Sequence, residues 1–173
     1  MVVIAPSLLA ADFGKLQSQI ELVENAGAEW LHFDIMDGHF VPNLSYGPDV
    51  VRQMRKHSKM FFDVHLMVEE PLNFLPLFEN CGADLITVHY EACSDLQAVI
   101  KYLRKRNIRV GISLKPKTSE VVLEPFMDDI DNILIMTVEP GFGGQSFMPE
   151  QLSKIRAVAE MVGTRDICIE VDG

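Results

Sequence analysis

The segment 31–43, with the sequence LHFDIMDGHFVPN, carries a histidine and an aspartate inside a run that is otherwise apolar. Successive side chains of a strand point to opposite faces, so His32, Asp34 and Met36 would share one face. Burying an imidazole and a carboxylate on that face costs free energy unless a partner compensates them. The segment therefore predicts either a metal site or a catalytic site.

His65 and Asp172 extend this pattern, because each stands near the carboxyl end of another expected strand. Two imidazoles and two carboxylates suit one divalent ion, which could be Zn²⁺, Fe²⁺, Mn²⁺ or Co²⁺. Taken singly, an inward histidine is more often a hydrogen-bonded core residue, and Asp172 could cap a helix. The combination of all four with His32 and Asp34 favours the metal site.

Other polar residues nearby have simpler interpretations. Asp37 has the opposite strand parity to Asp34 and precedes a glycine, so we expect it to form a turn or cap. Asp63 shares the parity of His65 and could orient an imidazole. We expect His57 to be solvated, whereas His39 and His89 could support the site or be structural.

Met36, Met67 and Met136 fall at the ends of three expected strands. They could fill the core, or they could form an apolar, polarisable cover over a developing negative charge. The glycine-rich loop 140–145 precedes a helix that should begin near Pro149. Its backbone N–H groups could bind a phosphate, although spacing alone is equally compatible with a plain flexible loop.

Short apolar runs alternate along the chain with amphipathic stretches that would position these groups. Strands are predicted at 3–8, 30–36, 60–67, 85–89, 109–114, 132–137 and 168–171, and helices at 12–26, 48–56, 71–80, 94–106, 119–126 and 149–162. Strict alternation predicts right-handed βαβ units and a parallel sheet. A repeat of about 25 residues, with no G-x-G-x-x-G after the first strand, favours a (β/α)₈ TIM barrel over a dinucleotide-binding fold.

Composition limits the classes of partner. The chain has 173 residues, 48% hydrophobic and 23% charged, and we expect one domain over 1–173. A formal net charge of -10 argues against nucleic acid and anionic membranes as partners. A small anionic substrate is compatible with it. Three widely spaced cysteines and no basic leader or long apolar run predict a cytoplasmic protein.

The chain resembles the ribulose-phosphate 3-epimerase family. The motifs that carry this resemblance occur in the family's order, at 5–9 (APSLL), 32–43 (HFDIMDGHFVPN), 63–67 (DVHLM), 136–145 (MTVEPGFGGQ) and 170–173 (EVDG). The resemblance implies a ribulose-phosphate-binding (β/α)₈ barrel. It also implies metal-dependent interconversion of D-ribulose 5-phosphate and D-xylulose 5-phosphate through an enediolate, with two carboxylates that transfer protons at C3.

By the same resemblance, particular positions take on roles in that reaction. His32, Asp34, His65 and Asp172 match the metal ligands, and Asp34 and Asp172 match the acid/base pair. Ser7 and His65 match substrate contacts. The loop residues that match a phosphate-binding segment are Gly141, Phe142, Gly143 and Gly144.

The family pattern continues beyond Gly173 with strand eight and a phosphate-binding loop, so we expect the barrel to be incomplete, with about seven strands. Barrels of this kind commonly bind phosphate after strands seven and eight. We therefore expect the 173-residue chain alone to be a poor enzyme. Unpaired edge strands also favour association, so a homo-oligomer is expected.

Two alternatives stay open. An epimerase for another ketose phosphate, such as allulose 6-phosphate, would use the same groups, whereas a non-catalytic truncated remnant would bind metal without turnover. A decarboxylase of the related barrels is disfavoured, because the chain has no Asp-x-Lys-x-x-Asp motif.

Overall fold

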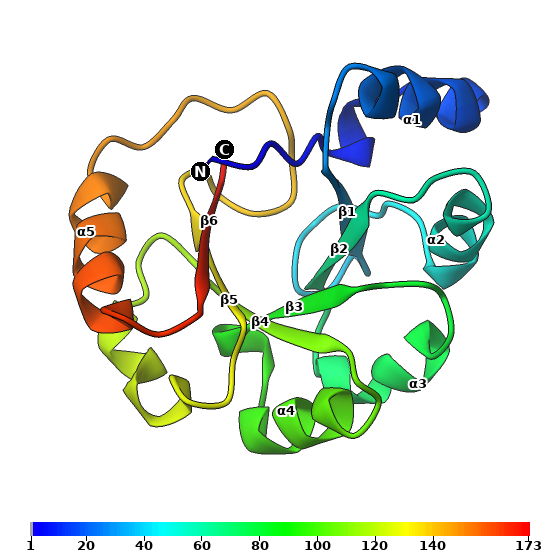
Figure 1. Cartoon of the computed structure of the whole chain (residues 1–173). Helices are drawn as coiled ribbons and strands as arrows, with labels where there is room; N and C mark the ends of the chain where they lie inside the picture. Colours follow the sequence, from blue (N-terminus) through cyan, green and yellow to red (C-terminus); the bar gives the residue numbers. More distant parts are fainter. Residues whose placement is uncertain (1) are drawn as a thin grey trace.

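A computed structural model describes residues 2–173 and contains one parallel sheet whose strands follow chain order, β1-β2-β3-β4-β5-β6. The strands are β1 (Trp30–Met36), β2 (Phe61–Met67), β3 (Leu85–His89), β4 (Arg109–Leu114), β5 (Asn132–Met136) and β6 (Cys168–Asp172). The sheet curls, the helices lie outside the curl, and β1 and β6 form its two edges (Figure 1). This half-barrel is consistent with a TIM-type fold.

Short helical segments connect the strands. The α-helices are α1 (Leu16–Asn25), α2 (Pro48–Arg55), α3 (Leu75–Phe78), α4 (Leu96–Arg104) and α5 (Gln151–Val162). The 3₁₀ segments are η1 (Leu8–Ala10), η2 (Phe13–Lys15), η3 (Pro71–Asn73), η4 (Tyr90–Ala92) and η5 (Glu120–Phe126).

Helix α4 illustrates why these stretches become helices and pack as they do. The side chain of Asp95 caps its first turn by accepting a hydrogen bond from the amide of Ala98. Its buried residues recur at helical spacing, at Leu96, Val99, Ile100 and Leu103. The helix therefore buries one apolar stripe against the outer face of the sheet.

The two faces of the sheet differ in chemistry, and this difference positions the site. Outward side chains such as Phe33, Phe62 and Val64 are fully buried in the main apolar core. The alternate, inward positions carry polar groups that are also buried, among them Asp63 and Thr87. The register of β1 on β2 pairs His32 with Asp63 and Asp34 with His65, so inward polar side chains become neighbours across strands.

Six of the predicted strands are confirmed, and the expected count of about seven is not confirmed within residues 2–173. The predicted strand 3–8 is replaced by an isolated bridge between Ser7 and His32. The amide of His32 donates to the carbonyl of Pro6 at 2.9 Å, but proline has no N–H with which to extend a ladder. Within residues 2–173 the segment also has no strand on its other side, so pairing stops at one bridge.

Three helix predictions also need correction. In the predicted helix 119–126, Glu120–Phe126 form the 3₁₀ segment η5 rather than an α-helix, because Pro125 cannot supply an α-helical N–H. The predicted helix 71–80 is divided into η3 and α3, and the first turn of 12–26 is the 3₁₀ segment η2.

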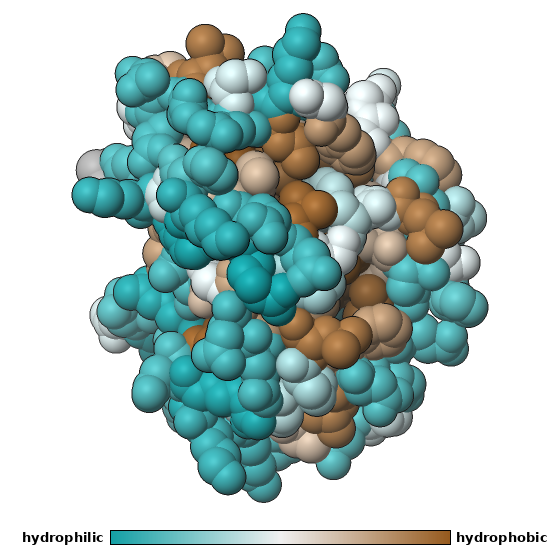
Figure 2. All heavy atoms as spheres, turned by 90° about the vertical axis from the view of Figure 1, so that its right-hand side faces the viewer, coloured by the Kyte–Doolittle hydropathy of each residue, from teal (hydrophilic) through white to brown (hydrophobic). Residues whose placement is uncertain are grey.

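One face of the outer surface can be followed in a space-filling view (Figure 2). The face that carries α1 and α2 is mainly hydrophilic, with apolar side chains exposed in smaller patches between the polar ones (Figure 2). Among the helices of residues 2–173, none is both long and apolar enough to cross a membrane. Association into a homo-oligomer stays a prediction.

Candidate active site

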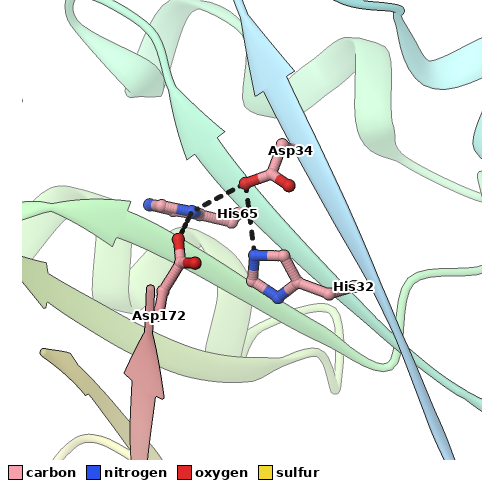
Figure 3. Close-up of side chains that lie close together, drawn as sticks. All are labelled: His32, Asp34, His65 and Asp172. Carbon is pink, nitrogen blue, oxygen red and sulfur yellow. Dashed lines mark ion pairs between the residues drawn. The ribbon is translucent and has the colours of Figure 1, made fainter. Parts of the chain in front are cut away.

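The curl of the sheet brings four chemically active side chains together on its inner face. His32 and Asp34 come from β1, His65 from β2 and Asp172 from β6, and they point toward one another (Figure 3). One ligand atom from each residue lies within 4.8 Å of the others. Because β1 and β6 are opposite edges of the sheet, only its curvature brings Asp34 and Asp172 into the same cluster.

The spacing of these atoms fits a divalent cation. Oδ1 of Asp34 lies 3.3 Å from Nε2 of His32 and 3.4 Å from Nδ1 of His65, and Oδ2 of Asp172 lies 3.9 Å from the same Nδ1. Bonds of 2.0–2.2 Å in a tetrahedral zinc site separate neighbouring ligand atoms by roughly 3.4 Å.

Two of these atoms also lack other partners. Nε2 of His32 and Nδ1 of His65 are buried, and neither makes a hydrogen bond within the described chain. Buried polar atoms are normally satisfied, so two imidazole nitrogens aimed at one carboxylate indicate that a ligand completes the cluster. The residues present therefore fit a metal bound by two nitrogens and two carboxylates.

Two carboxylates, one buried and one partly buried, fix the ring of His32. Its Nδ1 lies 2.5 Å from Oδ2 of Asp63 and 3.4 Å from Oε1 of Glu170. Asn132 in turn donates from Nδ2 to Glu170 at 2.8 Å. Asp63 thus contacts His32 rather than His65, because the register pairs it with β1. These contacts leave Nε2 of His32 pointing into the cluster.

The two central carboxyl groups experience opposite electrostatic effects. Burial opposes ionisation of Asp34, but His32 and His65 outweigh it and hold the pKa of Asp34 well below its ordinary value. Burial raises the pKa of Asp172, against the opposing effect of the two histidines. Environments that push two carboxyl pKa values apart are typical of acid/base pairs. Ser7 donates to Oδ2 of Asp34 at 2.5 Å and so orients that carboxylate.

A cavity of about 370 Å³ opens onto this cluster. Its polar part is formed by Ser7, Asp34 and Asp172, and its apolar part includes Met36, Met67 and Met136. Pockets for small ligands combine an apolar lining with a few polar groups in this way. The three methionines therefore lie against the space that a ligand would occupy.

The glycine-rich loop forms the rim of the same cavity, through residues 139–144. Asn43 donates from Nδ2 to the carbonyl of Gly141 at 2.8 Å, and Gln145 braces the loop through the carbonyls of Glu139 and Phe142. Gly141 has φ of 118°, and a Cβ there would lie 3.1 Å from Val41, so the tight turn favours glycine. Within 2–173 the amides of 143 and 144 make no hydrogen bond, which leaves them available to an anion.

The chain is similar to known proteins over almost its whole length. The model of the ribulose-phosphate 3 epimerase family matches residues 3–173. This chain belongs to that family. It is 46% identical to ribulose-phosphate 3-epimerase of Bacillus subtilis, over 100% of this chain and 81% of that protein. It is 47% identical to the enzyme of Synechocystis over 99% of this chain and 76% of the relative.

The partners of His65 were not assigned from the sequence, in which His89 could either support the site or be structural. Nε2 of His65 lies 2.9 Å from Nε2 of His89, and Nδ1 of His89 lies 3.4 Å from Oε2 of Glu91. His89 shares the inward parity of Thr87 within a buried strand, and that parity was the available signal. Glu170 has the same strand parity as Asp172, and Glu91 follows His89 by two residues, but parity alone does not show which imidazole each carboxylate contacts. His57 is exposed, as predicted.

Asp37 forms the expected turn, and its carboxylate joins two loops at the rim. It accepts hydrogen bonds from the amides of His39, Phe40 and Glu69 at 2.8, 3.0 and 2.8 Å. Burial opposes ionisation, but these amides outweigh it and lower the pKa of Asp37. The stabilisation should therefore be complete above the unfolded-state pKa, about 3.9, and be lost as the pH falls through the folded-state pKa.

We expect Asp37→Ala to lower the free energy of unfolding by about 1–3 kcal/mol at neutral pH, because three amides lose their acceptor. Urea unfolding followed by circular dichroism measures this, and the difference from wild type should shrink in acid. Asp128→Ala, which removes an exposed carboxylate that only pairs with Arg165, is the control. Equal stability of Asp37→Ala and Asp128→Ala would contradict the role of Asp37.

Proposed function

We propose that this chain interconverts D-ribulose 5-phosphate and D-xylulose 5-phosphate. The observation that carries the proposal is the convergence of Asp34 and Asp172, from opposite edges of the curled sheet, on one cavity with two unpaired histidine nitrogens. The names of the relatives supply the substrate class. We also propose that residues 1–173 form one domain with the curvature of a (β/α)₈ barrel.

Inversion at C3 of a ketose requires removal of a proton beside the carbonyl and its return to the opposite face. One carboxylate acts as base while the other acts as acid, and the roles exchange in the reverse direction. The substrate passes through an enediolate between the two transfers. Asp34, held ionised by its histidine neighbours and aligned by Ser7, suits the base for one epimer. Asp172, whose pKa is raised, suits the acid in that direction.

His32, Asp34, His65 and Asp172 would hold a divalent ion, which is Zn²⁺, Fe²⁺, Mn²⁺ or Co²⁺. A bound ion supplies a Lewis acid that stabilises negative charge developing on the substrate oxygens. Asp63 and Glu170 keep the ring of His32 in place for that ligation. Met36, Met67 and Met136 exclude water from the side of the cavity where this charge develops.

The rim loop supports recognition of the substrate phosphate. The amides of Gly143 and Gly144 lie at the cavity, and such backbone groups bind anions without a basic side chain. Recognition of this kind is compatible with a chain whose formal net charge is -10. The neighbouring side chain of Phe142 is exposed, and a bound ligand could cover it.

The test is turnover of D-ribulose 5-phosphate and allulose 6-phosphate side by side, with products identified by NMR. We expect xylulose 5-phosphate from the pentulose, at a higher kcat/KM than for the hexulose. A preference for allulose 6-phosphate would instead assign the chain to a hexulose phosphate. Metal binding without turnover of either sugar would favour a non-catalytic protein and contradict the proposal.

A further inference from the structure

We infer that Glu91, acting through His89, holds the proton of His65 on Nε2 and thereby keeps Nδ1 of His65 free to ligate the divalent ion. Glu91 and His89 are positioning residues, since neither lies at the four-residue cluster. The inference rests on the metal use in the proposed function. It extends that function to residues on β3 and on the segment that follows it.

The contacts form a continuous line from the cluster to the far side of β3. His65 and His89 are fully buried, and their rings lie 4.9 Å apart between centroids. Their Nε2 atoms are 2.9 Å apart, which is a hydrogen-bond distance. Nδ1 of His89 lies 3.4 Å from Oε2 of Glu91. The outer end of the line is therefore a carboxylate, and the inner end is the cluster.

The positions of the hydrogens on the two rings determine which imidazole donates the hydrogen bond between them. A carboxylate only accepts, so the ring nitrogen of His89 that faces Glu91 must carry the hydrogen. A neutral imidazole has one N–H, so Nε2 of His89 is then the acceptor. The hydrogen between the two rings must come from Nε2 of His65. In neutral His65, Nδ1 is then left with a lone pair, and a bound ion rather than a hydrogen would lie between this nitrogen and the carboxylates of Asp34 and Asp172.

The structure holds Glu91 in its charged, accepting form. The amide of Lys115 donates to Oε1 of Glu91 at 2.8 Å, and the hydroxyl of Thr118 donates to the same oxygen. Burial opposes ionisation, but bonds from His89, Thr118 and Lys115 outweigh it and lower the pKa of Glu91 to about 2. Lys154 in turn braces this turn by donating to the carbonyl of Lys115 at 3.0 Å.

Side chains also cover the ring of His89 and keep it from solvent. The ring of Phe40 lies 4.8 Å from the ring of His89, and the ammonium of Lys115 lies 3.9 Å from the Phe40 ring. Nδ1 of His89 makes no hydrogen bond within residues 2–173, and the carboxylate that faces it is that of Glu91, with Oε2 at 3.4 Å. Glu91 is thus the group that can decide which nitrogen of His89 carries the hydrogen.

Glu91→Gln tests which ring nitrogens of His89 and His65 carry the hydrogens, without changing the size of the side chain. The amide NH₂ of glutamine can donate to Nδ1 of His89, which would move the His89 hydrogen to Nε2 and the His65 hydrogen to Nδ1. That hydrogen would then occupy the ligand position. Glu70→Gln is the matched control, because Glu70 lies beside the segment 92–94 but accepts from Ser94 and does not contact His89.

Two measurements on the full chain read the result. Zn²⁺ affinity, from competition with a chromophoric chelator, should fall about 10- to 100-fold in Glu91→Gln and stay unchanged in Glu70→Gln. In the metal-free protein with neutral imidazoles, ¹⁵N NMR should find His65 protonated on Nε2 in wild type and on Nδ1 in Glu91→Gln. His89→Gln, whose amide oxygen can still accept from His65, should bind Zn²⁺ more tightly than His89→Leu.

Unchanged affinity and an unchanged His65 tautomer in Glu91→Gln would overturn the inference. A wild-type protein that binds no divalent ion would instead contradict the metal use in the proposed function. The tautomer measurement still decides the inference in that case, because it needs no metal.

Discussion

Asp34→Asn and Asp172→Asn are each expected to reduce epimerisation by about 10²–10⁴-fold, while each retains exchange of the C3 proton of a different epimer with D₂O. The two carboxylates come from opposite edges of the sheet, so each can reach one face of the substrate. An asparagine cannot accept a proton from C3. The remaining carboxylate can still remove the proton on its own face and return deuterium there.

Exchange followed by ¹H NMR distinguishes this mechanism from simple damage to the site. Asp128→Asn, which changes an exposed carboxylate far from the cavity, should retain full activity. Because Asp34 and Asp172 are also candidate ligands, Zn²⁺ affinity has to be measured in parallel for both variants. Exchange of the same epimer by both variants, or full epimerisation by either, would contradict two-carboxylate transfer.

The second large effect is expected on removal of divalent ions. Stripping bound metal should abolish epimerisation, since the charge that develops on the substrate loses its stabilisation. Zn²⁺, Fe²⁺, Mn²⁺ or Co²⁺ should restore activity better than Mg²⁺, because two of the four ligands are imidazole nitrogens. Full activity in a verified metal-free preparation would contradict the metal role.

Stability provides a readout of the same site that does not depend on turnover. An ion that binds the folded state alone, at about 100 times its Kd, stabilises it by about 2.7 kcal/mol. The Tm of wild type should therefore rise on addition of Zn²⁺. His65→Gln should lose most of this rise, whereas His57→Gln, at an exposed helix end, should retain it. Equal rises in both variants would place the ion elsewhere.

Local patterns were enough to predict most of the elements. The strand predicted at 30–36 agrees residue for residue with β1, and 85–89 and 109–114 agree equally with β3 and β4. Each of these is a short apolar run with clear boundaries. The failed strand at 3–8 depended on pairing partners elsewhere in the chain, which local composition does not report. The 3₁₀ segment at η5 reflects a proline inside an apparently helical pattern.

The sequence by itself determined the residue types of the site and the family to which they point. His32, Asp34, His65 and Asp172 could be selected because polar residues in buried strands are costly and need a compensating partner. Strand parity also showed which side chains share a face. These are local properties, set by a two-residue period along each strand.

The tertiary structure alone decided which of these groups meet. The inter-strand register placed Asp63 beside His32. The curl of the sheet brought Asp172, on the opposite edge strand, close to Asp34. The same packing placed His89 between His65 and Glu91. Distances between side chains on different strands depend on register and curvature, which arise from the whole sheet. No period within one segment encodes them.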